Sequence, residues 1–194
     1  MYDRITVTED AADIDLRKRI SALVRSPIWQ YGWKSTREGA QFAYWHSHFA
    51  GSDIGRENCE RELAAEPLLE PIYSLWKALE SRTLQGHEPM RVYANAHTYG
   101  VEGSVHIDDP DAENYFSTVY YAHPVWSHQW AGDTVFYSAD GQDIVRSIHP
   151  KPGRAVTFPG AIPHCARAPS RECNELRISI VMKTQRKIGD GPRT

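Results

Sequence analysis

The chain has 194 residues, of which 41% are hydrophobic and 24% charged. This length suffices for one well-buried core, so we expect a single domain over residues 1–194. The formal net charge is −3 and the sequence has no Lys/Arg tract, which disfavours a nucleic-acid partner. An acidic start and the lack of a long apolar run disfavour a secretion signal and a membrane span. A cytoplasmic protein is therefore expected.

The first part of the chain, residues 1–88, is predicted to contain helices and loops. One helix, which Pro27 would end, is predicted from four apolar residues at helical spacing: Leu16, Ile20, Leu23 and Val24. A second helix is predicted over residues 67–82 from another apolar stripe: Leu68, Ile72, Leu75, Trp76 and Leu79. The aromatic, Gly-punctuated stretch 28–51 between them is expected to form an ordered loop.

From about residue 90 the hydrophobic pattern becomes strand-like. Short runs rich in β-branched and aromatic residues alternate with Gly and Pro turns. They predict strands at 91–99, 115–122, 133–138, 143–148, 154–159 and 176–183, with shorter ones near 105 and 165. Seven or eight such strands indicate a mainly β fold, a jelly roll or a barrel, with the N-terminal helices packed outside. We expect a β core over residues 89–184 and a loose tail over 185–194.

The stretch VHIDDP contains the one histidine of the chain that a carboxylate follows two positions later, the pair His106 and Asp108. In a strand both side chains would point to the same side, so both could face one ion. His164, which follows the turn PGAIP, is the best candidate for a third ligand. Two imidazoles and one carboxylate on one face are typical of non-haem Fe(II) oxygenases. Alternatively, the pair closes a turn and His164 is an ordinary loop histidine.

Arg177 and Ser179 share one face of the last predicted strand. A buried arginine in such a strand is costly unless an anion pairs with it. A co-substrate with a carboxylate would serve, because arginine can bind it with two parallel hydrogen bonds and Ser179 can add a third. The alternative is an arginine on the solvated face of an edge strand.

Residues 91–183 resemble the double-stranded β-helix core of the Fe(II)/2-oxoglutarate dioxygenases, and among them the prolyl-4-hydroxylase-like group. The resemblance rests on RVYANAHTYGVEGSVHID, STVYYAHPVW, WAGDTVFY, IHPKPGRAVTFPGAIPH and LRISIV. It implies that the protein uses Fe(II), 2-oxoglutarate and O2. It also implies that His106, Asp108 and His164 bind the iron, and that Arg177, with Ser179, binds the distal carboxylate of 2-oxoglutarate.

In the same group, the second tyrosine of the YY pair often reaches that carboxylate, which implies a co-substrate contact for Tyr121. This sequence departs from the group's pattern at two places. The gap before Arg177 is longer than usual, which leaves Arg171 as a weaker competitor. The usual double glycine is Ala131-Gly132 here.

Other polar and aromatic residues are candidates for the walls of the pocket. Asn95 precedes the metal motif on a predicted strand and is expected to help bind 2-oxoglutarate. Candidates for substrate contacts are His97 and Tyr99 on the same strand, and aromatic or His-rich segments elsewhere, namely Trp126, Trp130, His46 and His48. Aromatic clusters are more often packing than recognition, so these residues have a structural alternative.

The predicted function is hydroxylation of an unactivated C–H bond with release of succinate and CO2. The expected substrate is a small polar metabolite or a natural-product intermediate. A peptidyl-prolyl or other protein hydroxylase with the same mechanism is an alternative. Two further alternatives dispense with 2-oxoglutarate: a cupin-like metal enzyme, and a non-catalytic β-barrel binding module.

Overall fold

The computed structural model describes residues 1–35, 42–52 and 57–187. Its strands form two antiparallel sheets. The large sheet has the strand order β1 (Thr6–Thr8), β8 (Ala155–Pro159), β5 (Tyr115–Tyr121), β10 (Arg177–Arg186), β4 (His87–His97), β3 (Tyr44–Ala50), β2 (Gln30–Trp33). The small sheet has the order β7 (Ile144–Ile148), β6 (Thr134–Tyr137), β9 (His164–Ala166).

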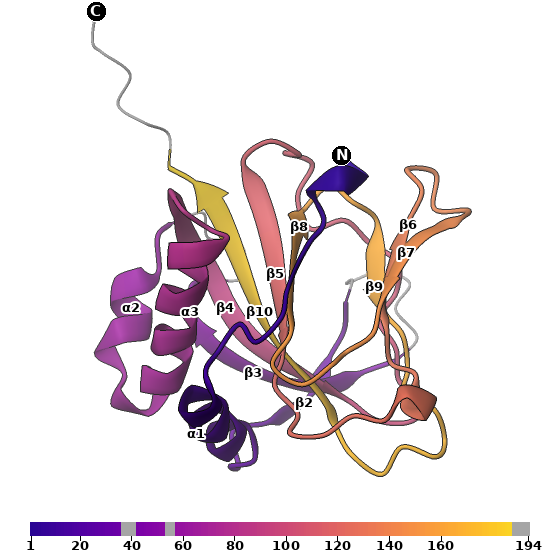
Figure 1. Cartoon of the computed structure of the whole chain (residues 1–194), viewed down its shortest axis with the longest axis horizontal. Coiled ribbons are helices and arrows are strands. Elements are labelled where there is room, and N and C mark those ends of the chain that lie inside the picture. Colours follow the sequence, from indigo (N-terminus) through magenta and orange to yellow (C-terminus); the bar gives the residue numbers. More distant parts are fainter. Residues whose placement is uncertain (36–41, 53–56, 188–194) are drawn as a thin grey trace, which may run out of the picture.

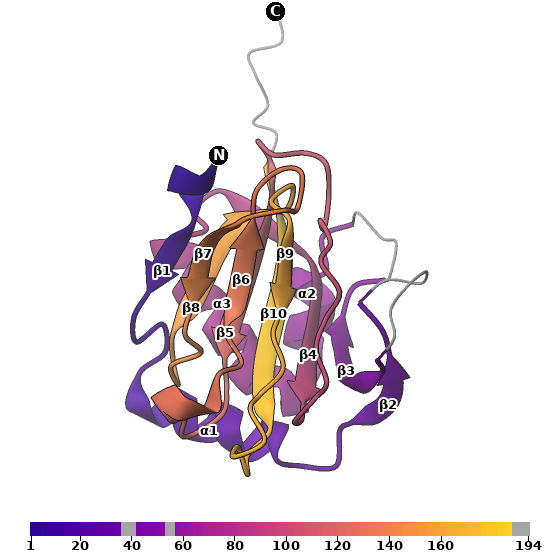
Figure 2. The ribbon, with the colours of Figure 1, turned by 90° about the vertical axis from the view of Figure 1, so that its right-hand side faces the viewer.

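The helices lie on one face of the large sheet, and the small sheet stands against the other face (Figure 1). These helices are α1 (Ile14–Val24), α2 (Glu60–Ala65) and α3 (Glu70–Arg82). Turning the molecule by 90° places the small sheet in front of β5 and β10 (Figure 2). The prediction of a jelly-roll core with helices packed outside is confirmed.

Both predicted helices are present. α1 begins after Asp13, whose Oδ1 accepts a hydrogen bond from the backbone N–H of Leu16 at 2.8 Å. α3 buries the predicted apolar stripe except Leu68, which lies in the preceding 3₁₀ turn Pro67–Leu69 and is exposed. The short helix α2 was not predicted. No helix in the described ranges is long and apolar enough to cross a membrane.

The prediction of a loop over residues 28–51 was wrong, because residues 30–33 and 44–50 add two strands to the sheet. β3 pairs antiparallel with β4, and β2 pairs with β3 at the sheet edge. In β3 the burial of side chains does not alternate simply, since Tyr44 and His46 are buried on one face and Phe49 on the other. Strands that bury parts of both faces lack the period-two pattern on which the prediction relied.

The strand predicted near residue 105 is also absent as such. His106 forms one isolated antiparallel bridge with His164, and its neighbours are irregular. At the other end of the β core, β10 continues to Arg186. The remainder of the predicted tail, from residue 188, lies outside the described residues.

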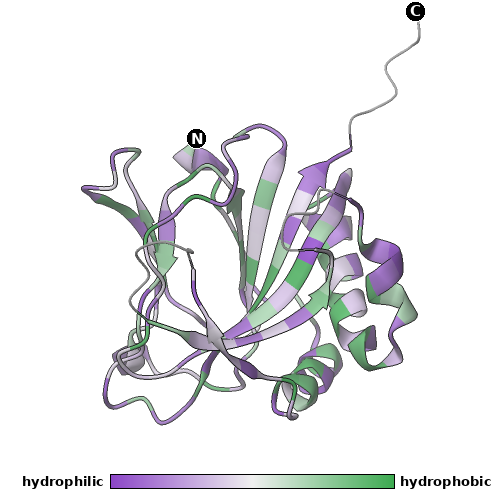
Figure 3. Cartoon of the chain, turned by 180° about the vertical axis from the view of Figure 1, so that it is seen from behind, coloured by the Kyte–Doolittle hydropathy of each residue, from purple (hydrophilic) through white to green (hydrophobic). Residues whose placement is uncertain are grey.

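The central strand β10 separates two environments. Its residues Ile178, Ile180 and Met182 belong to the core beneath the helices. The residues between them face the other way, toward the small sheet, because side chains alternate along a strand. Figure 3 shows the resulting bands of hydrophobic and hydrophilic residues along the strands. A second apolar cluster between the sheets includes Phe136, Val156 and Phe158.

His123, just after β5, ties the start of β10 to the neighbouring loop. It is buried, and its Nδ1 accepts a hydrogen bond from the backbone N–H of Ile178 at 3.3 Å. Its Nε2 lies 2.6 Å from the carbonyl oxygen of Pro150 and donates to it. Burial lowers the pKa of His123 to about 3, so the folded protein holds a neutral imidazole.

We expect His123 to destabilise the protein as the pH falls from 6.5 to 5. Its folded pKa lies below the unfolded value of 6.5, so the unfolded chain binds the extra proton in this range. At about 1.4 kcal/mol per pH unit, the free energy of unfolding should fall by about 2 kcal/mol. Urea unfolding at pH 7 and pH 5 measures this for wild type and His123→Gln, with the exposed His128→Gln as control. An equal pH effect in wild type and His123→Gln would contradict the assignment.

Candidate active site

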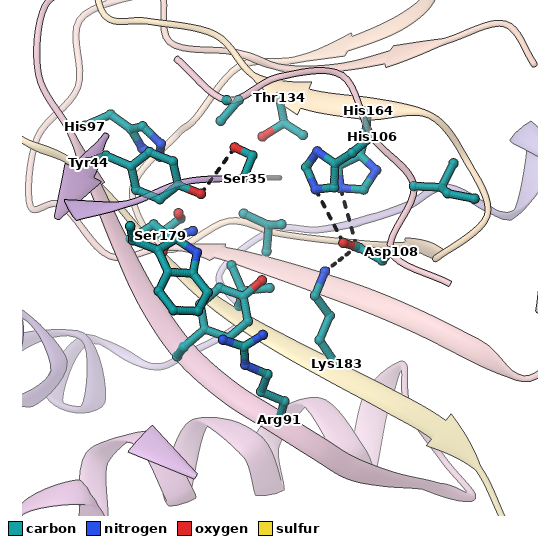
Figure 4. A pocket seen from close by; sticks show the side chains of 18 of the residues that line it. Ser35, Tyr44, Arg91, His97, His106, Asp108, Thr134, His164, Ser179 and Lys183 are labelled. Atoms are coloured by element: carbon teal, nitrogen blue, oxygen red, sulfur yellow. Dashed lines mark hydrogen bonds and ion pairs between the residues drawn. The ribbon is translucent and has the colours of Figure 1, made fainter. Parts of the chain in front are cut away.

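A cavity of about 270 Å³ lies between the two sheets. Its floor is formed by the inward faces of β4 and β10, because every second residue of these strands points into it. These residues are Arg91, Tyr93, Asn95 and His97 on β4, and Arg177, Ser179, Val181 and Lys183 on β10. His106, Asp108 and His164 line the same cavity, as Figure 4 shows.

The predicted metal ligands lie together. One ligand atom from each of His106, Asp108 and His164 falls within 4.8 Å of the other two. Two backbone hydrogen bonds of 2.9 and 3.1 Å join the two histidines across their bridge. In a third backbone hydrogen bond, the N–H of Asp108 donates to the carbonyl oxygen of Gly160 at 2.8 Å. The ligands converge because a bridge and a turn position them, not because two of them share a strand as predicted.

Both imidazoles are oriented for metal binding. The Nδ1 of His106 lies 2.8 Å from the carbonyl oxygen of Ser104, and the Nδ1 of His164 lies 2.8 Å from that of Ile162. Each Nδ1–H therefore donates to the backbone. Each Nε2 lies 3.4 Å from an oxygen of Asp108, so its lone pair is available to an ion placed between the three groups. Burial lowers the pKa of His164 to about 4, so this ring is neutral at pH 7.

Asp108 carries a negative charge at neutral pH. Its burial would raise its pKa, but the ammonium of Lys183 holds the pKa well below its usual range. The ammonium of Lys183 contacts Oδ2 of Asp108, and Ser117 donates to the same oxygen at 2.5 Å. Ser117 also accepts a hydrogen bond from Lys183 at 3.1 Å.

Arg177 is buried at the start of β10, with 1% of its surface exposed. Its Nε donates to the carbonyl oxygen of Gly132 at 2.5 Å, and its Nη2 donates to the hydroxyl of Thr134 at 3.0 Å. Its Nη1 is buried and has no hydrogen-bond partner among the described residues. A buried, unsatisfied donor on a cavity wall is costly unless a ligand accepts from it. By contrast, the competitor Arg171 is exposed.

Tyr121 supports Arg177 from behind. Its ring centroid lies 5.5 Å from the guanidinium carbon, and its hydroxyl donates to Thr134 at 2.7 Å. Tyr121 is not among the residues that line the cavity, whereas Thr134 is. The co-substrate contact predicted for Tyr121 stays a prediction, and the structure places Thr134 between its hydroxyl and the cavity. Thr134, which follows the Ala131-Gly132 pair, was missed by the sequence reasoning.

Three predicted wall residues lie at or near the cavity. Asn95 and His97 line it, and His97 is 2% exposed. Burial, followed by the positive charge of Arg177, lowers the pKa of His97 to about 3. His46 lies behind Asn95, and its Nδ1 is 2.8 Å from the side-chain oxygen of Asn95. His46 also stacks on Trp33, with ring centroids 4.1 Å apart.

The other predicted substrate contacts do not line the cavity. Tyr99 is 62% exposed, and His48 is exposed on β3. Trp126 and Trp130 pack against each other with ring centroids 5.4 Å apart. Trp126 lies beside Gly132, where an added Cβ would come within 2.9 Å of its ring. These two tryptophans support the turn that holds Arg177, so packing explains them better than recognition does.

Several lining residues were missed, although the alternation of the strands could have identified some of them. Arg91 and Tyr93 continue the face of β4 that carries Asn95, and Lys183 continues the face of β10 that carries Arg177. The missed residues include Trp33, Ser35, Ser52, Arg91, Tyr93, Tyr115, Thr134 and Lys183.

Comparison with known proteins relates one part of the chain to a known family. Residues 93–182 match the family model described as the 2OG-Fe(II) oxygenase superfamily. The chain contains a 2OG-Fe(II) oxygenase domain. Oxygenases of this family use Fe(II), 2-oxoglutarate and O2. A search of curated proteins found no match.

Solved oxygenase structures resemble this chain in fold. An oxidoreductase of the 2OG-Fe(II) oxygenase family from Burkholderia pseudomallei has a TM-score of 0.70 at 18% identity, over 93% of this chain and 84% of that one. A prolyl-4-hydroxylase from Pseudomonas putida has a TM-score of 0.63 at 20% identity, over 94% and 92%. A Trichoplax adhaerens prolyl hydroxylase, in complex with a hypoxia inducible factor peptide fragment, has 0.59 at 16%, over 94% and 83%.

The side chains of this oxygenase suit its cofactors. Two imidazoles and one carboxylate are a donor set that binds Fe(II) and leaves coordination positions open. The orphaned Nη1 of Arg177 suits one oxygen of a carboxylate. The hydroxyl groups of Thr134 and Ser179 lie on the same cavity wall and can donate to that carboxylate.

Proposed function

We propose that His106, Asp108 and His164 bind Fe(II), and that Arg177, with Ser179 and Thr134, binds the distal carboxylate of 2-oxoglutarate. The observation that carries this proposal is the buried Nη1 of Arg177, which has no partner among the described residues and lies on the wall of the cavity that holds the triad. A rival that uses no 2-oxoglutarate leaves this buried charge unexplained.

We further propose that the enzyme hydroxylates a C–H bond of a small polar metabolite. Bound Fe(II) supplies the oxidising chemistry: O2 and 2-oxoglutarate are consumed, one oxygen atom enters the substrate as a hydroxyl group, and succinate and CO2 leave. The protein's residues orient the reactants. The Nδ1–H bonds of the imidazoles keep both Nε2 atoms aimed at the metal position, and Arg177 holds one end of 2-oxoglutarate so that its other end reaches that position.

The size of the cavity favours a small substrate. Its volume of about 270 Å³ must also accommodate 2-oxoglutarate, so little space remains for a second molecule. The apolar side chains of Val119 and Val181 line it as well, which suits a partly apolar ligand near the metal position.

A protein hydroxylase is the second candidate. The Pseudomonas putida neighbour is a prolyl-4-hydroxylase, and the Trichoplax neighbour was solved with a peptide fragment. A peptide that lies across the mouth of the cavity would need only one side chain inside it.

Substrate-stimulated succinate release tests both candidates. Purified protein with Fe(II), ascorbate and 2-oxoglutarate is incubated with amino acids and biosynthetic intermediates, and in parallel with proline-rich peptides. We expect metabolites to increase succinate release at least tenfold over the substrate-free rate. Stimulation by peptides alone would replace the first candidate with the second. If no succinate forms under any condition, the oxygenase assignment of the site fails.

A further inference from the structure

A lysine is buried beside the metal triad, six residues beyond Arg177 on β10. Lys183 lines the cavity, and 7% of its surface is exposed. Its ammonium contacts Oδ2 of Asp108 (Figure 4) and donates a hydrogen bond to the hydroxyl of Ser117 at 3.1 Å. A buried ammonium is costly unless such partners compensate it. Its pairing with a proposed metal ligand therefore indicates a role in the metal site.

The strands of the large sheet fix Lys183 and Ser117 side by side. The two residues are direct cross-strand partners in the antiparallel pairing of β10 with β5. Side chains of such partners lie on the same face of a sheet, with their Cβ atoms about 5 Å apart. Asp108 comes from a different segment, whose backbone is joined to Gly160 by a hydrogen bond. Two hydrogen-bond donors on a rigid sheet thus hold a carboxylate that an irregular segment carries.

The two oxygens of Asp108 differ in what surrounds them. Oδ2 accepts a hydrogen bond from Ser117 at 2.5 Å in addition to its contact with Lys183. A carboxylate oxygen has about two lone pairs, so these two donors occupy both. The unprotonated Nε2 atoms of His106 and His164 lie 3.4 Å from Oδ1 and Oδ2, respectively, and cannot donate to them. Oδ1 is therefore the oxygen that is left to bind an ion.

The contact with Lys183 also places a positive charge next to the metal position. A cation close to a metal site destabilises bound Fe(III) more than bound Fe(II), because the repulsion grows with the charge of the ion. Hydrogen bonds to a ligating carboxylate reduce the electron density that it donates, which again disfavours the higher charge. Little of the Lys183 and Asp108 side chains is exposed, so water screens these effects only weakly. Both effects favour the ferrous ion.

We propose that Lys183, together with Ser117, is a positioning residue of the iron site. It holds Oδ2 of Asp108 so that Oδ1 is presented to the ion, and its charge keeps the ion ferrous. The reaction that it suppresses is the transfer of one electron from bound Fe(II) to O2, which yields Fe(III) and superoxide. This inference rests on the proposed function, because it assigns supporting residues to the proposed iron site.

The midpoint potential of the bound iron, titrated without oxygen and followed by absorbance, tests the proposal. Lys183→Met removes the charge and should lower the potential by at least about 59 mV, which is a tenfold shift in relative affinity from Fe(II) toward Fe(III). Lys183→Arg keeps the charge and should stay close to wild type. Ser117→Ala loses only a neutral donor and should shift the potential less than Lys183→Met does. Lys151→Met changes an exposed lysine that does not line the cavity, and it should match wild type.

A metal-free experiment tests how the carboxylate is held. Asp108→Gly leaves Lys183 and Ser117 without their anion, so formate, the smallest carboxylate, should raise the melting temperature of this variant. The double variant Asp108→Gly/Lys183→Met should need at least tenfold more formate, and neutral formamide should act on neither. An unchanged potential in Lys183→Met, or an equal response of the two glycine variants to formate, would overturn the inference.

The proposed function fails by a different result. Wild-type protein that forms no visible charge-transfer band with Fe(II) and 2-oxoglutarate in the absence of oxygen would contradict the proposed iron site. The formate experiment needs no iron, so it would still decide whether Lys183 holds a carboxylate.

Discussion

Replacing His106, Asp108 or His164 by alanine will abolish the visible charge-transfer band that forms when Fe(II) and 2-oxoglutarate are added without oxygen. The two remaining ligands cannot hold both the ion and the chelating co-substrate, so iron affinity should fall by about a hundredfold or more. The band, measured against Fe(II) concentration, reports the loss directly. Succinate release should be lost in the same variants.

Two control variants make this result specific. His48→Ala removes an exposed histidine that does not line the cavity, and it should leave the band unchanged. Asp108→Asn keeps the size of the side chain but removes its charge, and it should still lose iron. Because Lys183 would then lack its carboxylate partner, the melting temperature should be recorded for each variant. An unchanged band in His164→Ala would remove that residue from the metal site.

Arg177→Ala will raise the requirement for 2-oxoglutarate strongly while it leaves iron binding nearly intact. Loss of one partner of a buried charged pair costs roughly 2–5 kcal/mol, and each 1.4 kcal/mol corresponds to about tenfold in affinity. The concentration of 2-oxoglutarate at half-maximal succinate release should therefore rise on the order of a hundredfold or more. The metal triad lacks contact with this guanidinium, so the Fe(II) dependence should change little.

Arg171→Ala is the matched control for this experiment, since Arg171 is exposed and precedes β10. It should leave the 2-oxoglutarate requirement unchanged. A larger effect in Arg171→Ala than in Arg177→Ala would show that the co-substrate is bound by the loop instead of by the strand. Arg177→Lys should fall between wild type and alanine, because it keeps the charge but loses the planar fork.

The residues of the site were easier to predict from the sequence than the backbone conformation that places them. The spacing of His106 and Asp108 identified the metal motif, yet these residues sit at a bridge and a bend and not in the predicted strand. Arg177 was found because a charged residue interrupts an apolar strand. Lys183 lies on the same face of β10 and was missed, because it stands at the end of the apolar run where a lysine is usually solvated.

The N-terminal part was the least predictable from local patterns. β2 and β3 were interpreted as a loop, because their aromatic and polar residues serve two different surfaces. β3 is stabilised by pairing with β4, whose residues lie roughly 40 to 50 positions later in the sequence, and β2 by pairing with β3. No local window contains the β3–β4 contact. Tyr121 illustrates a similar limit: its hydroxyl bonds Thr134, a residue on another strand.

The lining of the cavity comes from two parts of the chain. Asn95, Thr134, His164 and Arg177 lie within residues 93–182, which match the family model. Other lining residues lie before or after this stretch: Trp33, Ser35, Tyr44, Ser52, Arg91 and Lys183. Substrate selectivity can therefore change through substitutions in β2 and β3 and at Arg91 on β4. The metal ligands and Arg177 would stay unchanged. Grafting β2 and β3 onto a related scaffold would be a way to transplant preference without rebuilding catalysis.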